Sequence, residues 1–177
     1  RQMGIRARTG TGDATNHLNY LANEGSAVLT ITDGGSVVLN RAWLAFGRAA
    51  DSSNPAILGD STITVQGSGS SFETTGDMLV GRVGNASVTV SDGAVLKNNG
   101  VAIGGWSYSP EAVGSGSLTV TGSGTTWINS GGVEVGRGGN ATASLEISNG
   151  ANATIAGGVY GGPNASVLIT GNDTSVT

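Results

Sequence analysis

Short stretches in which apolar and polar residues alternate recur along this chain of 177 residues. Each begins in the order apolar, polar, apolar and runs into a turn rich in Gly, Asp and Asn. The stretches are LTITDGG at Leu29, ITVQGSG at Ile63, VTVSDGA at Val88, LTVTGSG at Leu118, LEISNGA at Leu145 and VLITGND at Val167. Because side chains alternate between the two faces of a strand, this pattern predicts strands with one buried and one solvated face.

A second short strand, rich in aliphatic residues and ending in Gly, is predicted in most of the repeats. It reads LAFG from Leu44, MLVG from Met78, VAIG from Val101 and VEVG from Val133. The repeats lie roughly 22 to 34 residues apart, which suits a solenoid coil of two to three short strands. We therefore predict an all-β fold, a right-handed parallel β-helix of about six coils and roughly 30 Å in length.

The repeats alternate between two kinds. In one kind, a GSG turn is followed by hydroxyl side chains and an aromatic residue, Phe72 or Trp127. In the other kind, DGG, DGA or NGA is followed by an aliphatic stretch. Phe72 and Trp127 are as far apart as Val80 and Val135, which begin the similar lines VGRVGNAS and VGRGGNAT. We expect a unit of two coils, with equivalent residues stacked two coils apart.

The repeat divides the chain into two segments. Residues 1–25 do not match it, and we expect them to be a partial coil, a cap or a flexible segment. Residues 26–177 form the predicted repeat region. The chain ends inside a repeat, and the ends of such a column are strand edges that whole proteins cap. We therefore expect the chain to be a segment of a longer protein.

Composition narrows the chemistry of the predicted column. The chain has 32 Gly, 11% charged residues and no Cys, so disulfides, thiol catalysis and thiolate metal sites are excluded. Its net charge of −4 disfavours nucleic acid and anionic membranes as partners. No apolar stretch is long enough to span a membrane as a helix.

The sequence marks no catalytic constellation, so we expect no enzyme, no cofactor and no metal. Residues 76–82 are similar to a phosphate-binding loop but lack its Lys and its Ser or Thr. His17 is the only histidine, and no activated Ser is marked to act with it. The acids are scattered over turns and outward strand positions, whereas glycoside chemistry needs them clustered. The calcium-binding nonapeptide of β-helices is also missing.

Two insertions break the repeat. RAADSSNPAILGDS follows Phe46 and Gly47, and GWSYSPEAVGSG follows Ile103 and Gly104. Both follow the same strand of the same kind of repeat, so the two loops should leave one edge of the column, roughly 10 Å apart. Loops on a rigid scaffold commonly carry binding residues.

The predicted binding residues are Asn54 in the first loop and Trp106, Tyr108 and Glu111 in the second. The two aromatic residues are the strongest candidates, because Trp and Tyr combine a large apolar area with a polar group. The alternative is that both aromatic side chains fold back and cover the flank of the column.

The paired pattern SxxLTVxGxGxxW with VGxxG and LTIxxGA resembles the repeats of passenger domains of bacterial autotransporters. It covers residues 26–177 and is clearest at residues 63–69, 72, 80–84, 88–94, 118–124, 127, 135–139 and 145–151. The resemblance implies an extracellular module at the bacterial surface, exported through the outer membrane and held there by a C-terminal barrel outside this segment. It also implies adhesion to host cell-surface or matrix components, or self-association with other copies.

Two other functions stay open. A carbohydrate-active enzyme on the same scaffold would need a groove that holds at least two acids within about 10 Å. A passive stalk or spacer would leave all function to other parts of the parent protein.

Overall fold

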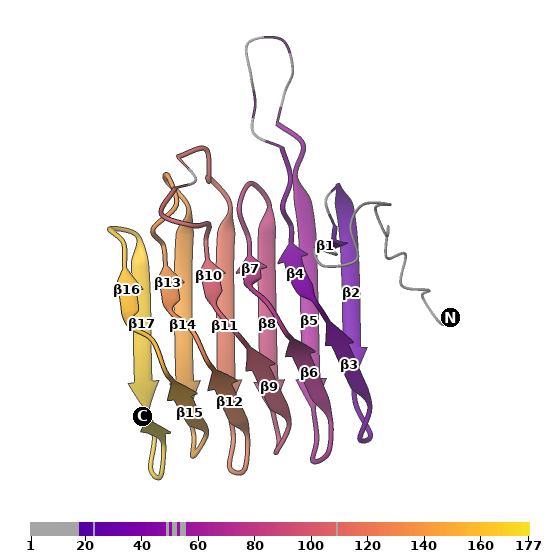
Figure 1. Ribbon diagram of the computed structural model, residues 1–177, viewed down its shortest axis with the longest axis vertical. Helices are drawn as coiled ribbons and strands as arrows, with labels where there is room; N and C mark the ends of the chain where they lie inside the picture. Colours follow the sequence, from indigo (N-terminus) through magenta and orange to yellow (C-terminus); the bar gives the residue numbers. More distant parts are fainter. Residues whose placement is uncertain (1–17, 23, 49, 51–52, 54–55, 109) are drawn as a thin grey trace.

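The computed structural model describes residues 18–22, 24–48, 50, 53, 56–108 and 110–177. All regular structure in these residues is strand, arranged in three parallel sheets of six strands each (Figure 1). Each coil gives one strand to each sheet. The predicted parallel β-helix of about six coils is therefore confirmed.

The three sheets differ in the length of their strands. Sheet B has the longest strands, β2 Gly25–Ile31, β5 Gly59–Gln66, β8 Asn85–Ser91, β11 Ser115–Thr121, β14 Thr142–Ser148 and β17 Ala165–Thr170. The strands of sheet C follow the turns after the sheet B strands. They are β3 Ser36–Leu39, β6 Ser71–Thr74, β9 Val95–Asn98, β12 Thr126–Asn129, β15 Asn152–Ile155 and β18 Ser175–Val176. Sheet A opens each coil with β1 Leu18–Leu21, β4 Arg41–Leu44, β7 Met78–Val80, β10 Val101–Ile103, β13 Val133–Val135 and β16 Val159–Gly161.

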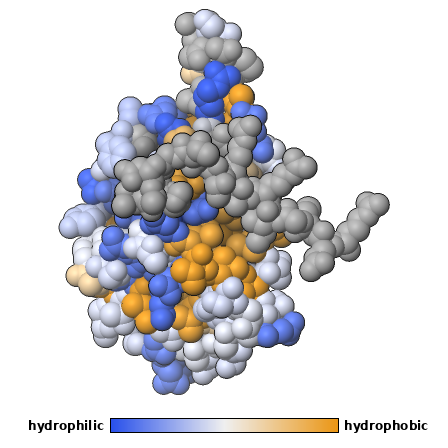
Figure 2. Space-filling model, turned by 45° about the vertical axis from the view of Figure 1, so that its right-hand side comes forward, coloured by the Kyte–Doolittle hydropathy of each residue, from blue (hydrophilic) through white to orange (hydrophobic). Residues whose placement is uncertain are grey.

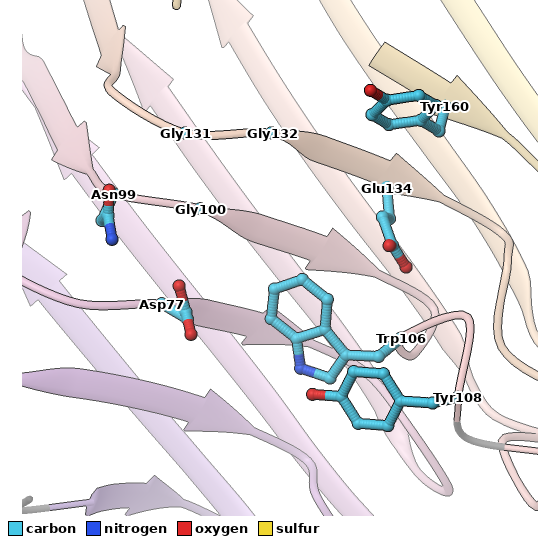
Figure 3. Close-up of a pocket in the computed structure, with 9 residues that line it drawn as sticks. All are labelled: Asp77, Asn99, Gly100, Trp106, Tyr108, Gly131, Gly132, Glu134 and Tyr160. Atoms are coloured by element: carbon cyan, nitrogen blue, oxygen red, sulfur yellow. The ribbon is translucent and has the colours of Figure 1, made fainter. Parts of the chain in front are cut away.

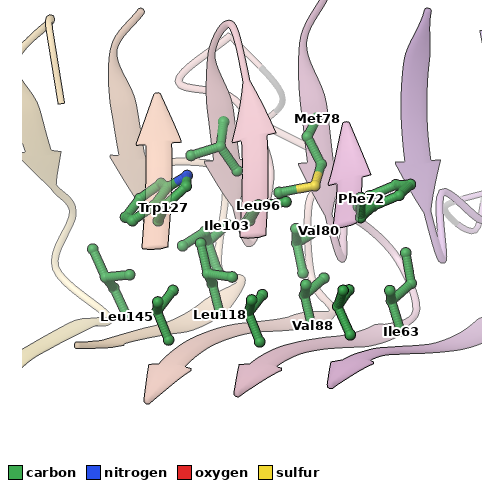
Figure 4. Packing of buried hydrophobic residues seen from close by; sticks show 14 of the residues in the cluster. Ile63, Phe72, Met78, Val80, Val88, Leu96, Ile103, Leu118, Trp127 and Leu145 are labelled. Carbon is green, nitrogen blue, oxygen red and sulfur yellow. The ribbon is translucent and has the colours of Figure 1, made fainter. Parts of the chain in front are cut away.

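The core consists of apolar side chains stacked in register along the column (Figure 4). In sheet C, Leu96 pairs with Phe72 on one side and with Trp127 on the other. All three side chains are fully buried. Val80 and Val135 are likewise buried and lie two coils apart in sheet A. The predicted stacking of equivalent residues two coils apart is confirmed.

The two kinds of turn have different backbones. Asp92 and Gly93 both have positive φ, 55° and 83°, and Asp and Asn tolerate that region better than most residues. In the GSG turn the first and third residues, Gly122 and Gly124, have φ of 92° and 79°. The sequence difference between the repeats therefore reflects two distinct turn conformations.

A hydrogen bond joins each turn of the Asp-Gly kind to the GSG-type turn of the next coil. The N–H of Gly93 donates to the hydroxyl of Thr125 at 3.0 Å. The same bond runs from Gly34 to Ser70 at 3.1 Å and from Gly150 to Thr174 at 2.9 Å. These hydroxyl side chains explain why the structural unit is a pair of coils.

The first Gly-ended strand lies two residues earlier than predicted. Val80 pairs with Leu44, and the strand ends there. Ala45 takes the corner position of Gly81, with φ of 48° against 73°. The alignment of LAFG with MLVG is therefore wrong, because an alanine occupies a corner at which the coils that follow use glycine.

The solenoid strands begin at Leu18, inside the segment 1–25. β1 pairs with β4 along its whole length. Partly buried Leu21, Val37 and Leu39 pack against the core at this coil, and Figure 2 shows apolar side chains gathered at this end of the column. His17 lies outside the described residues. No helix in the described part of the chain could cross a bilayer.

Candidate functional site

The two insertions leave the column at the same edge, as predicted. Residues 45–58 connect β4 to β5, and residues 104–114 connect β10 to β11. In sheet A only β7 lies between β4 and β10, so the loops are two coils apart. Both rise from the upper edge of the column in Figure 1.

The first loop has a narrow base. The backbones of Arg48 and Ile57 exchange two hydrogen bonds, of 2.9 and 2.8 Å, in an antiparallel bridge. Asn54, the predicted binding residue of this loop, lies outside the described residues. Its predicted role therefore stays a prediction.

The aromatic side chains are concentrated beside sheet A. The chain has 3 Trp, 3 Tyr and 2 Phe, and of these only Phe72 and Trp127 are fully buried in the core. The other six lie in sheet A or in the loops that follow its strands. They are Tyr20, Trp43, Phe46, Trp106, Tyr108 and Tyr160. The flank formed by sheet A is therefore richer in aromatic side chains than the rest of the surface.

The first aromatic cluster anchors both loops to the column. The ring of Phe46 stacks on Trp43 with centroids 4.7 Å apart and meets the edge of Tyr20 at 5.6 Å. The guanidinium of Arg82 lies 4.3 Å from the centroid of Phe46. Arg82 also forms an ion pair with Glu111 of the second loop. Burial lowers the pKa of Arg82, and Tyr20 opposes this shift.

Glu111, a predicted binding residue, therefore has a structural partner. Its carboxylate pairs with Arg82 and does not line the cavity described below. Arg82 lies in the turn after β7, so this pair ties the second loop to a neighbouring coil. The contact of Arg82 with Phe46 ties the first loop to the same turn.

Trp106 and Tyr108 form the second aromatic cluster. Their rings are nearly parallel, at 6°, with centroids 6.1 Å apart. Between them, Ser107 donates its backbone N–H and its hydroxyl to the carboxylate of Glu134, at 2.7 and 3.2 Å. Glu134 faces outward on β13, so it holds this part of the loop against sheet A.

The two predicted interpretations of this aromatic pair both describe part of the geometry. Leu79 and Ala102 lie in one register row with Glu134 on the outer side of sheet A, yet both are completely buried. The flank is thus covered next to the loop. Tyr108 itself stays 75% exposed, so the pair still presents an aromatic surface to solvent.

A cavity of about 420 Å³ lies between this pair and Tyr160 (Figure 3). We call it the sheet A groove. Its floor includes the backbone of Gly100, Gly131 and Gly132, which lead into β10 and β13. Its volume falls within the range of about 300–1,000 Å³ typical of ligand pockets.

The glycines of the floor are not equivalent. A Cβ on Gly131 would lie 2.4 Å from the carbonyl oxygen of Asn99, so the stacking of the coils requires glycine there. A Cβ on Gly132 would meet nothing closer than the carbonyl oxygen of Gly158, at 3.6 Å. Packing therefore does not require Gly132, whose missing side chain leaves the groove open.

Polar groups converge on the groove from three coils. Asp77, Asn99 and Glu134 line it with two carboxylates and one amide. Partial burial of the otherwise exposed Tyr108 phenol raises its pKa, Asp77 and Glu134 raise it further, and Arg41 opposes them. The Tyr108 hydroxyl is therefore a neutral hydrogen-bond donor at physiological pH.

Asp77, Asn99 and Tyr160 were missed in the sequence. Asp77 and Asn99 belong to the turns before β7 and β10, and Tyr160 lies on β16 opposite Glu134. The sequence marks this site only when the turns before successive sheet A strands, TGD, NNG, SGG and AGG, are aligned with one another. The register of sheet A places these turns on neighbouring coils, side by side. The order of residues along the chain alone does not reveal this.

The groove brings two acids together, but their environments differ. Glu134 already accepts two hydrogen bonds from Ser107, whereas no side-chain hydrogen bond to Asp77 is found within the described residues. In the same part of the chain no group of three or more His, Cys, Asp or Glu side chains is placed to hold a metal ion. The groove is thus suited to binding through hydrogen bonds and ring stacking.

No protein-family model, curated protein or solved structure matches this chain significantly.

Proposed function

We propose that this chain is an adhesive module of an extracellular bacterial β-solenoid protein, of the autotransporter passenger type that its repeats resemble. The observation that carries the proposal is the placement of six aromatic residues along one flank, outside the core. Trp and Tyr are enriched in binding interfaces because they offer large contact areas with few rotatable bonds. The partner is a host cell-surface or matrix component, or a second copy of the chain.

The contrast with sheet B supports this assignment of the binding flank. The outward positions of β8 and β11 carry Ser and Thr, such as Thr89 and Thr119, which pair across neighbouring coils. A hydroxyl-covered face is well solvated and needs no partner. An exposed aromatic surface such as that of Tyr108 is costly to solvate, which is typical of a surface that binds.

Adhesion of beads coated with the chain tests the proposal. The beads are applied to epithelial cell monolayers, to immobilised fibronectin and collagen, and to beads carrying the same chain. We expect the double variant Trp106→Ala/Tyr108→Ala to reduce attachment to at least one of these surfaces about tenfold, the effect of removing an interface hot spot. The matched control Thr89→Ala/Thr119→Ala changes the hydroxyl-rich face and should leave attachment unchanged.

Equal attachment by the aromatic variant and by the wild type would overturn the assignment of the loop. No attachment by the wild type to any of the three surfaces would favour a passive spacer. Thermal unfolding followed by circular dichroism must be similar for both variants, so that a loss of attachment reports on the surface and not on the fold.

A carbohydrate-active enzyme is the second candidate, because Asp77 and Glu134 line one groove. That chemistry needs one carboxyl group as acid and the other as base or nucleophile. The hydrogen bonds from Ser107 commit Glu134 to holding the loop, which favours adhesion over catalysis. Release of reducing ends by the wild type, abolished in Asp77→Asn, would establish the enzyme instead.

A further inference from the structure

We propose that the sheet A groove binds an uncharged carbohydrate chain, held by ring stacking on the Trp106–Tyr108 pair and by hydrogen bonds with Asp77, which accepts them, and with Asn99. This inference rests on the proposed adhesive function and names the chemical class of its ligand. It depends on four properties of the groove: its flat aromatic wall, its polar groups, its balance of charge and its bare floor.

The aromatic wall offers a flat apolar surface. Trp106 and Tyr108 are stacked within 6° of parallel, so the pair presents one flat outer ring face as a small platform and not a box around a ligand. Figure 3 shows this pair on one side of the groove and Tyr160 on the other. A pyranose ring has a flat face of C–H groups, which packs well against such a platform.

The polar groups suit a ligand that both donates and accepts hydrogen bonds. The carboxylate of Asp77 only accepts, the amide of Asn99 does both, and the neutral hydroxyl of Tyr108 donates. Sugar hydroxyls satisfy all three, because each has one donor and two acceptor sites. An aliphatic ligand of the same size would leave these groups without partners, at a cost in affinity.

The charges at the groove balance. Asp77 and Glu134 line it, while Arg137 lies 5.4 Å from the ring centroid of Tyr160 and Arg41 acts on Tyr108. Two acids and two arginines leave little net field to attract an ion. An anionic polymer would meet the two carboxylates of the lining.

An organic cation is also disfavoured at this groove. A cation needs a free aromatic face beside a free carboxylate. Arg137 already occupies the position over the ring of Tyr160, and Glu134 is engaged by Ser107, which leaves Asp77, among the described residues, as the one unengaged carboxylate of the lining. The platform of Trp106 and Tyr108 has only one open wall to offer, which is enough for a sugar ring but does not enclose an ammonium group.

The floor leaves room for a ring to lie flat. Gly132 has an ordinary backbone conformation and space for a Cβ, so the column tolerates alanine at this position. A methyl group there would enter the groove and reduce the space above the floor. Gly132→Ala therefore tests occupancy of the groove without removing any group that holds the loop.

The experiment is affinity electrophoresis of the whole chain through native gels. The gels contain one of four neutral polysaccharides, namely dextran, mannan, galactomannan and xyloglucan, or one of two anionic polymers, polygalacturonate and heparin. A parallel fluorescence titration uses spermine as an organic cation. We expect at least one neutral polysaccharide to retard the protein, and neither anionic polymer nor spermine to bind as tightly.

Two variants and one control make the test specific. We expect Trp106→Ala and Gly132→Ala each to weaken retardation about tenfold, the effect of losing a central contact. Gly161→Ala is the matched control, because a Cβ there meets only the side chain of Ala165, at 3.7 Å, and Gly161 does not line the groove. It should leave retardation unchanged.

The ligand class is overturned if no neutral polysaccharide retards the wild type, if retardation is the same in Gly132→Ala, or if spermine or the anionic polymers bind more tightly. The two proposals fail separately. Loss of adhesion in the Trp106 and Tyr108 variant without any binding of neutral polysaccharide leaves the adhesive function standing and overturns the ligand class. Binding of a neutral polysaccharide together with unchanged adhesion of the Trp106 and Tyr108 variant would leave the ligand class standing and overturn the adhesive function of this loop.

Discussion

Trp127 and Trp106 lie in two different regions of the protein, the core of the column and its outer flank, and their side chains make different contacts. Trp127 lies at the place that Phe72 takes two coils earlier, is fully buried, and donates its indole N–H to the side-chain oxygen of Asn98 at 2.6 Å. Trp106 lies in an insertion, is half-buried, and stacks on Tyr108 beside the sheet A groove. Trp127 follows the repeat and packs inside the column, whereas Trp106 departs from it and lies on the outer flank.

The same contrast holds for the polar groups around the tryptophans. Inside the column, Asn98 donates to Asn129, whose own amide donates to the carbonyl oxygen of Gly131 at 2.6 Å. The interior polar groups are thus satisfied in a chain. On the outer flank, the buried indole N–H of Trp43 has no hydrogen-bond partner among the described residues. The outer flank is less completely satisfied than the core.

The largest effect is expected from Trp127→Ala. Removing this side chain leaves a cavity in the core and an unpaired oxygen on Asn98, and we expect the free energy of unfolding to fall by about 3–5 kcal/mol. Denaturant unfolding followed by circular dichroism measures it. Trp106→Ala should cost about 1 kcal/mol or less, because this side chain is only half-buried and lies outside the core. Similar losses in the two variants would break the distinction between core and flank.

Gly84→Ala sharpens the same comparison with glycine. A Cβ at this position would lie 1.8 Å from the carbonyl oxygen of Gly59 on the neighbouring coil, so the spacing of the coils must change. We expect a loss of about 1–3 kcal/mol in unfolding free energy, as for other overpacked interiors. Gly132→Ala on the flank is the control and should differ from the wild type by about 0.5 kcal/mol at most. Equal destabilisation would show that the groove floor is as tightly packed as the corner.

A smaller effect is expected at the anchor of the loops. The side chains of Arg82 and Glu111 are 16% and 35% exposed, and solvent screens their attraction. A double-mutant cycle with Arg82→Met and Glu111→Gln should give a coupling energy of about 0.5–1 kcal/mol. Thermal unfolding at low and high salt provides the measurement. A coupling of zero at low salt would contradict the role of this pair in holding the second loop.

The smallest effect is a titration with little consequence for stability. The pKa of Tyr108 is raised above its ordinary value of 10.0, first by burial and then by Asp77 and Glu134. The absorbance at 295 nm of the wild type minus that of Tyr108→Phe should therefore show a midpoint above pH 10.0. Since the folded state favours the neutral phenol, its contribution to stability is present below the unfolded pKa and is lost as the pH rises through the folded pKa. A midpoint below 10.0 would contradict the position of Tyr108 beside the two acids.

The alternation of apolar residues and the glycine turns were sufficient to predict the fold, because both are set by local backbone geometry. The common edge of the two loops followed from the repeat as well. Of the residues that line the groove, only some could be predicted from the sequence. Trp106 and Tyr108 stand out as aromatic residues in an insertion, but Asp77 and Tyr160 acquire meaning only from the register of sheet A.

Two further differences have specific physical causes. The start of β4 was misplaced because Ala45 adopts a corner conformation that the repeat assigns to glycine. The ion pair of Glu111 with Arg82 was not predicted, because Arg82 lies in the turn of another coil. Contacts between coils depend on the lengths of the intervening loops, which a linear pattern does not reveal.

The bonds from Gly34, Gly93 and Gly150 to hydroxyl groups on the next coil give the column a parity. Each bond joins an odd-numbered coil to the even-numbered coil that follows. Removing the second coil of such a pair would place two turns of the Asp-Gly kind next to each other, and the Gly N–H would lose its hydroxyl acceptor. Adding or removing coils in pairs keeps these bonds, so a column of this design favours changes in its length, and in the position of its insertion loops along the axis, in steps of two coils.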